Sequence, residues 1–168
     1  PKLVIPIAGA AQFPFQLQVG KSSEWGLFAL TKYKYQFNEH LKGNLIFDIR
    51  EKQKFAGGFE NFYDTEKFGN GALRYYYADD RCDEDNVDCS RAEGHTKTET
   101  SRYRLQARHR MNLTEDTTLV TEFNKLSDEF IIQDFFYREE FERINFPDNY
   151  ISVIKADDNY TASLLGRY

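Results

Sequence analysis

"SRYRLQARHRM", residues 101–111, alternates two kinds of side chain along its whole length. The even positions are polar or cationic: Arg102, Arg104, Gln106, Arg108 and Arg110. The odd positions are mostly apolar: Tyr103, Leu105, Ala107, His109 and Met111. A period of two is that of a β-strand, whose successive side chains point to opposite faces of a sheet. The stretch therefore predicts a strand with one cationic face and one mostly apolar face.

The same alternation recurs along most of the chain. It predicts about eight strands, at residues 24–37, 44–50, 56–64, 71–78, 98–111, 117–126, 149–155 and 159–168. Short joints rich in turn-forming residues separate most of them, which predicts an antiparallel meander of hairpins. Two connections are longer, at 79–97 and 127–148. In the second, Ser127 or Asp128 would cap a short helix, although the segment equally suits a loop that packs on another part of the protein.

Residues 1–22 differ from the rest of the chain. Pro6 and Pro14 interrupt short apolar pieces, and each proline removes a donor from a sheet ladder. This pattern favours an edge or crossover element over the interior of a regular sheet. We therefore expect a boundary that divides residues 1–22 from residues 23–168.

The composition excludes several classes of function. A net charge of -5 argues against general nucleic-acid binding, which needs clustered positive charge facing phosphates. The mean hydropathy is -0.68, and no run is apolar and long enough for a membrane helix. The 168 residues suit one domain, and the 15 Phe and 11 Tyr exceed what a soluble core requires. Both ends read as if cut from a longer protein, so a missing signal peptide carries no information about location.

The two cysteines lie close together in an acidic, turn-rich loop. Cys82 and Cys89 have a spacing that a local disulfide can close, which would fit an oxidising compartment. Two free thiols in a reducing compartment remain the alternative. Zinc is disfavoured, because neither CxxC spacing nor a suitable histidine pair is present.

No catalytic constellation is evident in the sequence. His40, His95 and His109 are scattered, and no serine or cysteine has a base partner at a recognisable spacing. The acidic residues of 79–88 lack the spacing of an EF-hand. We therefore predict a protein that is not an enzyme, with no catalytic residue, no metal site and no cofactor.

Two architectures explain the alternation equally well. In a soluble β-sandwich or a lipocalin-like module, one face of each strand is buried and the other meets water. In a transmembrane barrel, the outer face meets lipid and the inner face lines a polar lumen. Aromatic residues near strand ends, such as Trp25, Tyr35 and Tyr77, are typical of the girdles of a barrel. Spans near ten residues also suit a tilted membrane strand. The side of a membrane that the two long connections would face is left open.

The order of several segments resembles one known family, the LPS-assembly outer-membrane proteins (LptD, also OstA). "LVIPIAGAAQFPF" (3–15) is similar to the proline-punctuated end of that family's periplasmic jelly roll. Residues 25–64 and "GNGALRYYYADD" (69–80) resemble its first barrel strands. The most specific stretch is "TTLVTEFNKLSDEFIIQDFF" (117–136), and "DNYTASLLGRY" (158–168) resembles a further strand. The family's disulfides between jelly roll and barrel have no counterpart here.

The resemblance implies a fold, a location and a function. The fold is all-β: an antiparallel meander that forms part of a large outer-membrane β-barrel, with residues 1–22 as the end of a periplasmic jelly roll. The function is transport of lipopolysaccharide into the outer leaflet of a Gram-negative outer membrane, past an LptE-type lipoprotein plug and from a periplasmic bridge protein. A passive porin-type channel and a soluble β-sandwich or lipocalin-like binding module are the alternatives.

The resemblance also implies roles for single residues. Phosphorylated sugars need a polar, cationic lumen, for which the candidates are Lys32, Lys34, Arg102, Arg104, Arg108 and Arg110. A solvated barrel wall against the plug is the alternative role for these six. Pro6 and Pro14 are candidates for a gate where strands must part.

Overall fold

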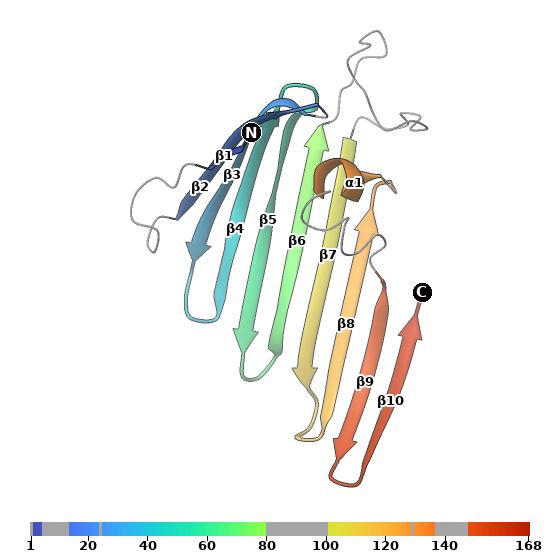
Figure 1. The fold of residues 1–168 in the computed structure, drawn as a ribbon. Helices are drawn as coiled ribbons and strands as arrows, with labels where there is room; N and C mark the ends of the chain where they lie inside the picture. The colour runs from blue at the N-terminus through green and yellow to red at the C-terminus, as the bar shows by residue number, and fades with distance from the viewer. Residues whose placement is uncertain (1, 5–13, 24, 80–100, 129, 137–147) are drawn as a thin grey trace.

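The computed structural model describes residues 2–4, 14–23, 25–79, 101–128, 130–136 and 148–168. In these ranges the strands form one ten-stranded antiparallel sheet in chain order (Figure 1). Its strands are β1 (Lys2–Val4), β2 (Phe15–Ser22), β3 (Gly26–Gln36), β4 (Leu41–Arg50), β5 (Lys54–Thr65), β6 (Gly69–Asp79), β7 (Ser101–Asn112), β8 (Thr117–Leu126), β9 (Tyr150–Asp157) and β10 (Tyr160–Arg167). One short helix, α1 (Ile131–Phe136), follows β8. The predicted all-β antiparallel meander is thus confirmed.

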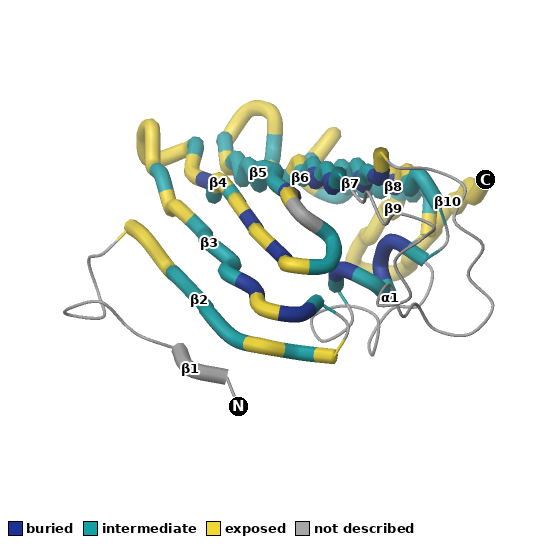
Figure 2. The backbone as a smooth tube through the Cα atoms, turned by 90° about the horizontal axis from the view of Figure 1, so that it is seen from above, coloured by how far each residue is buried: buried dark blue, intermediate teal, exposed yellow. Residues whose placement is uncertain are grey.

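The register of the sheet keeps residues of one parity on one face. Ala78 pairs with Arg102, and Gly71 pairs with His109. Even-numbered residues of β2–β9 therefore share one face, and odd-numbered residues share the other. In β10 the parity is reversed, because Ser163 pairs with Ile154. Figure 2 looks along the strands and shows a curved sheet with α1 on its concave side, against the even-numbered face. We call the two faces the concave face and the convex face.

The convex face carries exposed apolar side chains across most of the sheet. The large exposed hydrophobic residues of its strands are Phe15, Leu27, Tyr33, Leu45, Phe47, Ile49, Phe55, Leu73, Phe123, Ile151, Tyr160 and Leu164. Phe47 is 51% exposed and Ile49 is 62% exposed, although both lie in a strand with neighbours on each side. Soluble monomers rarely expose apolar patches of this extent. The convex face therefore presents an extended apolar surface in the described structure.

The core of the described structure lies on the concave face, beneath α1. Ile131, Ile132 and Phe135 of the helix are 0%, 2% and 4% exposed and pack against Ala56, Tyr76 and Ala78 of β5 and β6. Small alanines at two of the sheet positions leave room for the bulky side chains of the helix. The helix that was one of two predictions for this connection is therefore present, and it packs on the sheet.

The two ends of the sheet differ in their connections. At one end the connections from β3 to β4, β5 to β6, β7 to β8 and β9 to β10 are tight turns, at residues 37–40, 66–68, 113–116 and 158–159. We call this end the short-turn edge. At the opposite edge β6 ends and β7 begins, and β8 ends there as well (Figure 1). Both long connections thus belong to the same edge of the sheet.

Strand β2 lies within the segment that the sequence separated from the sheet. It pairs with β3 over its whole length, from Phe15 opposite Tyr33 to Ser22 opposite Gly26. The pattern Phe15, Leu17, Val19 has the period of two, which indicates a strand despite the nearby prolines. Pro14 itself lies just before the strand, where its carbonyl accepts a hydrogen bond from the Lys34 amide at 2.6 Å. The proline therefore marks the start of a sheet strand.

Two tyrosines on the convex face lie across a glycine of the next strand and reach the strand beyond it. Tyr63 of β5 pairs with Gly71 of β6, which pairs in turn with His109 of β7. The Tyr63 hydroxyl is 2.5 Å from His109 Nδ1. Tyr35, Gly43 and Asn61 repeat this arrangement two strands earlier, with a hydrogen bond from the Tyr35 hydroxyl to Asn61. A Cβ added at either glycine would collide with the tyrosine and with a backbone carbonyl oxygen, that of Glu60 at Gly43 and that of Arg108 at Gly71.

Substituting Gly71 by alanine is expected to destabilise the sheet by about 1–3 kcal/mol, because overpacking displaces the ring. An added Cβ would collide with the Arg108 carbonyl oxygen and would lie 2.5 Å from Tyr63 Cζ. Gly166→Ala is the matched control, since its Cβ would meet Ile151 Cγ2 at 3.4 Å, an ordinary contact. Denaturant unfolding of both variants measures the difference. Equal effects of the two substitutions would contradict the crowding of Gly71 by Tyr63 and the Arg108 backbone.

Candidate functional site

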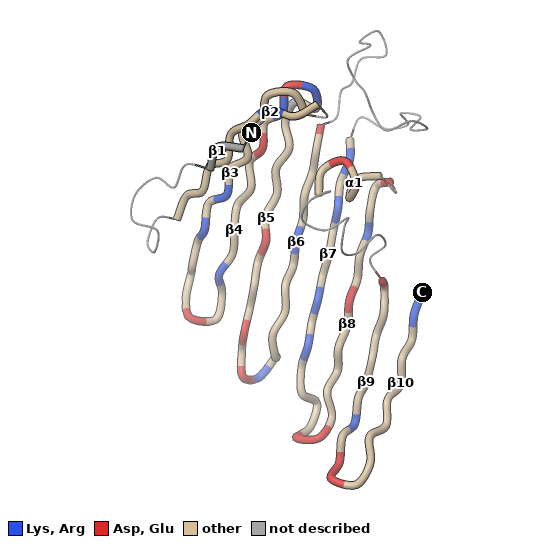
Figure 3. Tube along the Cα trace, viewed as in Figure 1, with Lys and Arg blue, Asp and Glu red and all other residues tan. Residues whose placement is uncertain are grey.

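All six cations that the sequence singled out lie on the concave face, but they fall into two groups. Arg102 and Arg104 are buried, at 3% and 5% exposure. Lys34 and Arg110 are exposed, and the side chains of Lys32 and Arg108 are 36% and 48% exposed. Figure 3 shows these charges on β3 and β7. Their role in lining a lumen remains a prediction, and the two groups have different surroundings.

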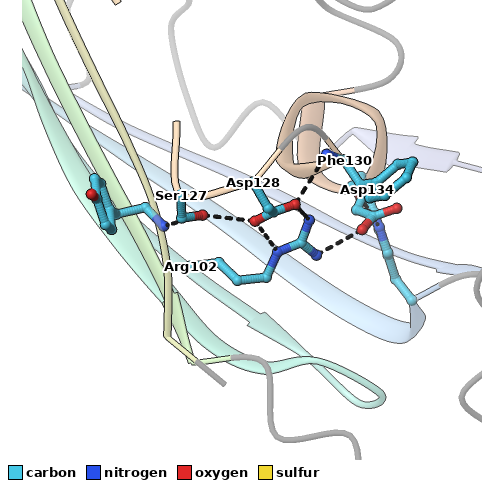
Figure 4. Close-up of polar contacts among 7 residues, drawn as sticks. Arg102, Ser127, Asp128, Phe130 and Asp134 are labelled. Carbon is cyan, nitrogen blue, oxygen red and sulfur yellow. Dashed lines mark hydrogen bonds and ion pairs between the residues drawn. The ribbon is translucent and has the colours of Figure 1, made fainter. Parts of the chain in front are cut away.

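Arg102 is held by two carboxylates from the segment that contains α1 (Figure 4). Its Nε and Nη2 donate to the two oxygens of Asp128 at 2.9 and 2.6 Å. Its Nη1 donates to Asp134 Oδ2 at 2.6 Å. Ser127 Oγ donates to Asp128 Oδ2 at 2.7 Å, which fixes the orientation of that carboxylate. A bidentate contact of this kind is strong as well as directional.

Asp128 also starts the helical segment. Its Oδ1 accepts a hydrogen bond from the Phe130 amide at 3.0 Å, just before α1 begins. Partial burial of the Asp128 carboxyl tends to raise its pKa, but the hydrogen bonds from Arg102 and Ser127 outweigh this effect and lower the pKa below its ordinary value. The carboxylate therefore stays ionised at neutral pH.

This lowered pKa predicts a pH dependence of stability. A carboxyl whose pKa is lower in the folded state stabilises the fold above its unfolded pKa, near 3.9. The contribution is lost as the pH falls below about 4, through the folded value. Denaturant unfolding between pH 6 and pH 2 should show this loss in the wild type and a smaller loss in Asp128→Asn. An unchanged acid profile in the variant would contradict the prediction.

The rings of α1 lie against three arginines of the concave face. The Phe135 ring lies 5.0 Å from the Arg50 guanidinium and 5.3 Å from that of Arg102. The Phe136 ring lies 5.1 Å from the guanidinium of Arg104. Contacts between guanidinium groups and aromatic faces are attractive and stronger where water is excluded. The Asp-Phe pair at 134–135 therefore has a specific role, with the carboxylate and the ring bound by the same arginine.

Arg50 and Trp25 extend the site toward β3, and the sequence analysis did not identify Arg50. Arg50 contacts Asp48 Oδ2 at 3.2 Å, and its guanidinium lies 4.6 Å from the centre of the Trp25 ring. Trp25 Nε1 donates to the Asp134 carbonyl at 2.9 Å. Tyr76 completes the network, since it accepts from Arg50 Nη1 at 2.9 Å and donates to Asp48 at 2.7 Å. The spacing of Asp48 and Arg50, two apart on the face of the other charges, was the available signal.

A second network crosses the concave face from β3 to β8. Glu60 accepts from Asn44 at 2.7 Å and lies 3.6 Å from Lys32 and 3.3 Å from Arg74. On β8, Glu122 lies 3.0 Å from Arg108 and accepts from Gln106 at 3.3 Å and from Asn124 at 3.2 Å. Arg74 Nη1 donates to Gln106 at 3.4 Å and joins the two halves. The carboxylates are recessed and the cations more exposed, so this row presents positive charge to its surroundings.

Of the remaining predicted site residues, three lie outside the described residues and one lies just before a strand. Pro6, Cys82 and Cys89 are not among the described residues. Pro14 precedes β2. The proposed gate at Pro6 and Pro14 and the proposed disulfide between Cys82 and Cys89 therefore remain predictions from the sequence.

The described side chains of the concave face provide charged groups that can bind a ligand of opposite charge. Within the described ranges, no cluster of three or more His, Cys, Asp or Glu residues is placed to hold a metal ion. None of the helical residues in these ranges makes a helix long and apolar enough to cross a membrane. What the arrangement provides is arginine and lysine donors on one face, which suit phosphate and carboxylate groups.

A scan against models of known protein families found no match, and a search of curated proteins found none.

Proposed function

We propose that this chain is part of an outer-membrane β-barrel that carries lipopolysaccharide into the outer leaflet. The convex face would meet lipid, and the concave face would line the lumen. The observation that carries the proposal is the division of one sheet into an exposed apolar face and a cationic face. The reaction is transport, in which no covalent bond is made or broken.

The dimensions of the strands support a membrane location. Strands β3–β8 have between 10 and 12 residues. A transmembrane strand tilted by about 45° needs about 9–11 residues. Tyr35 and Tyr63 lie on the convex face near the short-turn edge, where aromatic girdles of barrels meet the interface. A soluble sandwich would instead need a second layer of protein over the convex face.

The lengths of the connections favour one orientation. Outer-membrane barrels have short periplasmic turns and longer extracellular loops. The short-turn edge would then be periplasmic, and the connections after β6 and β8 would be extracellular. A chain arriving from a periplasmic domain directly into β2 would enter the sheet at the short-turn edge, whereas β1 begins toward the opposite edge, with Lys2 paired to Gly20. If the chain instead entered the sheet from the periplasm at β3, the connections after β6 and β8 would be periplasmic.

The concave face offers what a phosphorylated glycolipid needs from a lumen. Lys34, Arg108 and Arg110 are exposed there and lie toward the proposed periplasmic edge. Such cations neutralise phosphate charge that would otherwise be costly to move through a membrane protein. An LptE-type lipoprotein plug and a periplasmic bridge protein are the proposed protein partners, and the outer membrane is the proposed location.

Photo-crosslinking in cells tests this function in the full-length protein. A photoreactive phenylalanine replaces Lys34 or Arg110 on the concave face. The adjacent convex residues Tyr33 and Met111 provide matched controls near the same edge. We expect lipopolysaccharide adducts at the two concave positions, and their loss when the energy-driven pump of the inner membrane is depleted. The convex positions should give none, since the periplasmic leaflet consists of phospholipid.

Other outcomes would favour the alternatives. A correctly inserted protein without adducts at Lys34 and Arg110 would favour a passive porin-type channel. A protein that is soluble without detergent and folds with its convex face covered by other protein would favour a β-sandwich or lipocalin-like module. Adducts on both faces that ignore pump depletion would contradict transit along the concave face.

A further inference from the structure

The position of α1 depends on its contacts with the concave face. A helix of six residues has almost no stability of its own in water. The segment is held by the carboxylates on Arg102, by the stacking of Phe135 and Phe136 on arginines, and by burial of Ile131 and Ile132. The segment therefore behaves like a ligand that is tethered to the sheet.

The surface beneath this tethered segment has a cationic half and an apolar half. Arg102 and Arg104 lie two residues apart on β7, and their side chains leave the same face about 7 Å apart. Beside them, Ala56, Tyr76 and Ala78 make a flat apolar floor, now covered by the helix. The two halves together suit an amphiphile whose anionic group sits next to a hydrocarbon part.

The groups that now occupy the cationic half are carboxylates. Arg102 binds Asp128 through two parallel N–H donors, the geometry with which arginine also binds phosphate. The Asp128 side chain is 27% exposed and that of Arg102 is 4% exposed, so an incoming anion must displace the carboxylate to reach the guanidinium. A phosphate group carries more charge than one carboxylate and can compete for the same donors.

We propose that Arg102 and Arg104, with the floor of Ala56, Tyr76 and Ala78, form a binding site for a phosphate-bearing amphiphile. Asp128 and Asp134 occupy its cationic half as built-in competitors, and the isoleucines of α1 occupy its apolar half. Ligand binding releases the segment Ser127–Phe136 from the concave face. This inference rests on the proposed function for its class of ligand, and it adds a site that is closed until ligand arrives.

Trp25 reports whether the segment is bound. It is the single tryptophan of this chain, and its indole donates to the Asp134 carbonyl and stacks on Arg50. Fluorotryptophan in the full-length protein in lipid nanodiscs gives a fluorine resonance for it, assigned by its loss in Trp25→Phe. The probes are a bis-phosphorylated, acylated disaccharide, the same molecule without phosphates, and inorganic phosphate alone.

We expect the phosphorylated amphiphile to shift the Trp25 resonance, and the dephosphorylated one to need at least about tenfold more, as the loss of one charge-assisted hydrogen bond implies. Inorganic phosphate alone should leave the resonance in place, because it does not fill the apolar half. Asp128→Asn should lower the required concentration about tenfold, since it weakens the competitor. Asp116→Asn, the same substitution in an exposed turn, is the matched control and should have no effect.

An unchanged resonance at saturating phosphorylated amphiphile would overturn the inference, as would equal responses to both amphiphiles. If adducts at Lys34 and Arg110 still formed in cells, the proposed function would stand without this site. If those adducts were also absent, both would fail. Arg102→Gln should abolish the preference for phosphate. Should that variant not fold, the wild-type titration with the two amphiphiles decides.

Discussion

Replacing Arg102 by alanine is expected to lower the free energy of unfolding by about 3–5 kcal/mol, the cost of breaking a buried ion pair from one side. The Arg102 side chain is 4% exposed, and the substitution removes the guanidinium that donates to both Asp128 and Asp134. Phe135 also loses a guanidinium from its face. The expected loss is large because charge, hydrogen bonds and packing disappear together.

Arg108→Ala is the control for this prediction. Arg108 lies on the same strand and the same face and pairs with Glu122 at 3.0 Å, but its side chain is 48% exposed. Solvent screens such a pair, so its removal should cost about 0–1 kcal/mol. Denaturant unfolding of both variants, followed by tryptophan fluorescence, measures the contrast. Similar losses in the two variants would contradict the structural account of the buried cluster.

Phe47→Arg is expected to destabilise the protein in a bilayer by about 2–4 kcal/mol, the cost of an arginine on the lipid face near the midplane. Phe47 lies on the convex face of β4, opposite Thr31 and Gly57 of the neighbouring strands, and is 51% exposed. On a soluble protein, an exposed phenylalanine would tolerate this change within about 0.5 kcal/mol. The size of the effect therefore reports on the surroundings of the convex face.

Phe37→Arg is the control, because depth in the membrane decides the cost. Phe37 is 79% exposed and lies in the turn at the short-turn edge, where an arginine should cost about 0–1 kcal/mol. Reversible unfolding from lipid vesicles measures both variants. Equal and small effects at both positions would contradict a lipid-facing convex surface.

The alternation of residues was sufficient to predict strands β3–β10, but it did not predict that β1 and β2 belong to the same sheet. In β7 the arginines and the intervening Tyr103 and Leu105 do lie on opposite faces, because the period of two is a local property of the backbone. The short helix after Ser127 could also be predicted, because its polar cap and its apolar run are adjacent in the sequence. Local patterns thus predicted the local structure.

The contacts that build the site were beyond such patterns. Arg102 meets Asp128 and Asp134 from 26 and 32 residues away, and Trp25 meets Asp134 from 109 residues away. The alternation of β7 gives no indication that Arg102 and Arg104 are buried while Arg108 and Arg110 are exposed. That difference arises because α1 covers only part of the strand, which depends on the tertiary fold.

In the proposed barrel, the convex face meets lipid and the concave face meets water. Spin labels at Lys42, Asn44, Leu45, Phe47 and Ile49 of β4 test it, with the protein in a bilayer and collisions measured against oxygen and a water-soluble nickel chelate. We expect the odd positions to collide with oxygen and the even positions with the chelate. Chelate access at Leu45, Phe47 and Ile49 equal to that at Lys42 and Asn44 would contradict it.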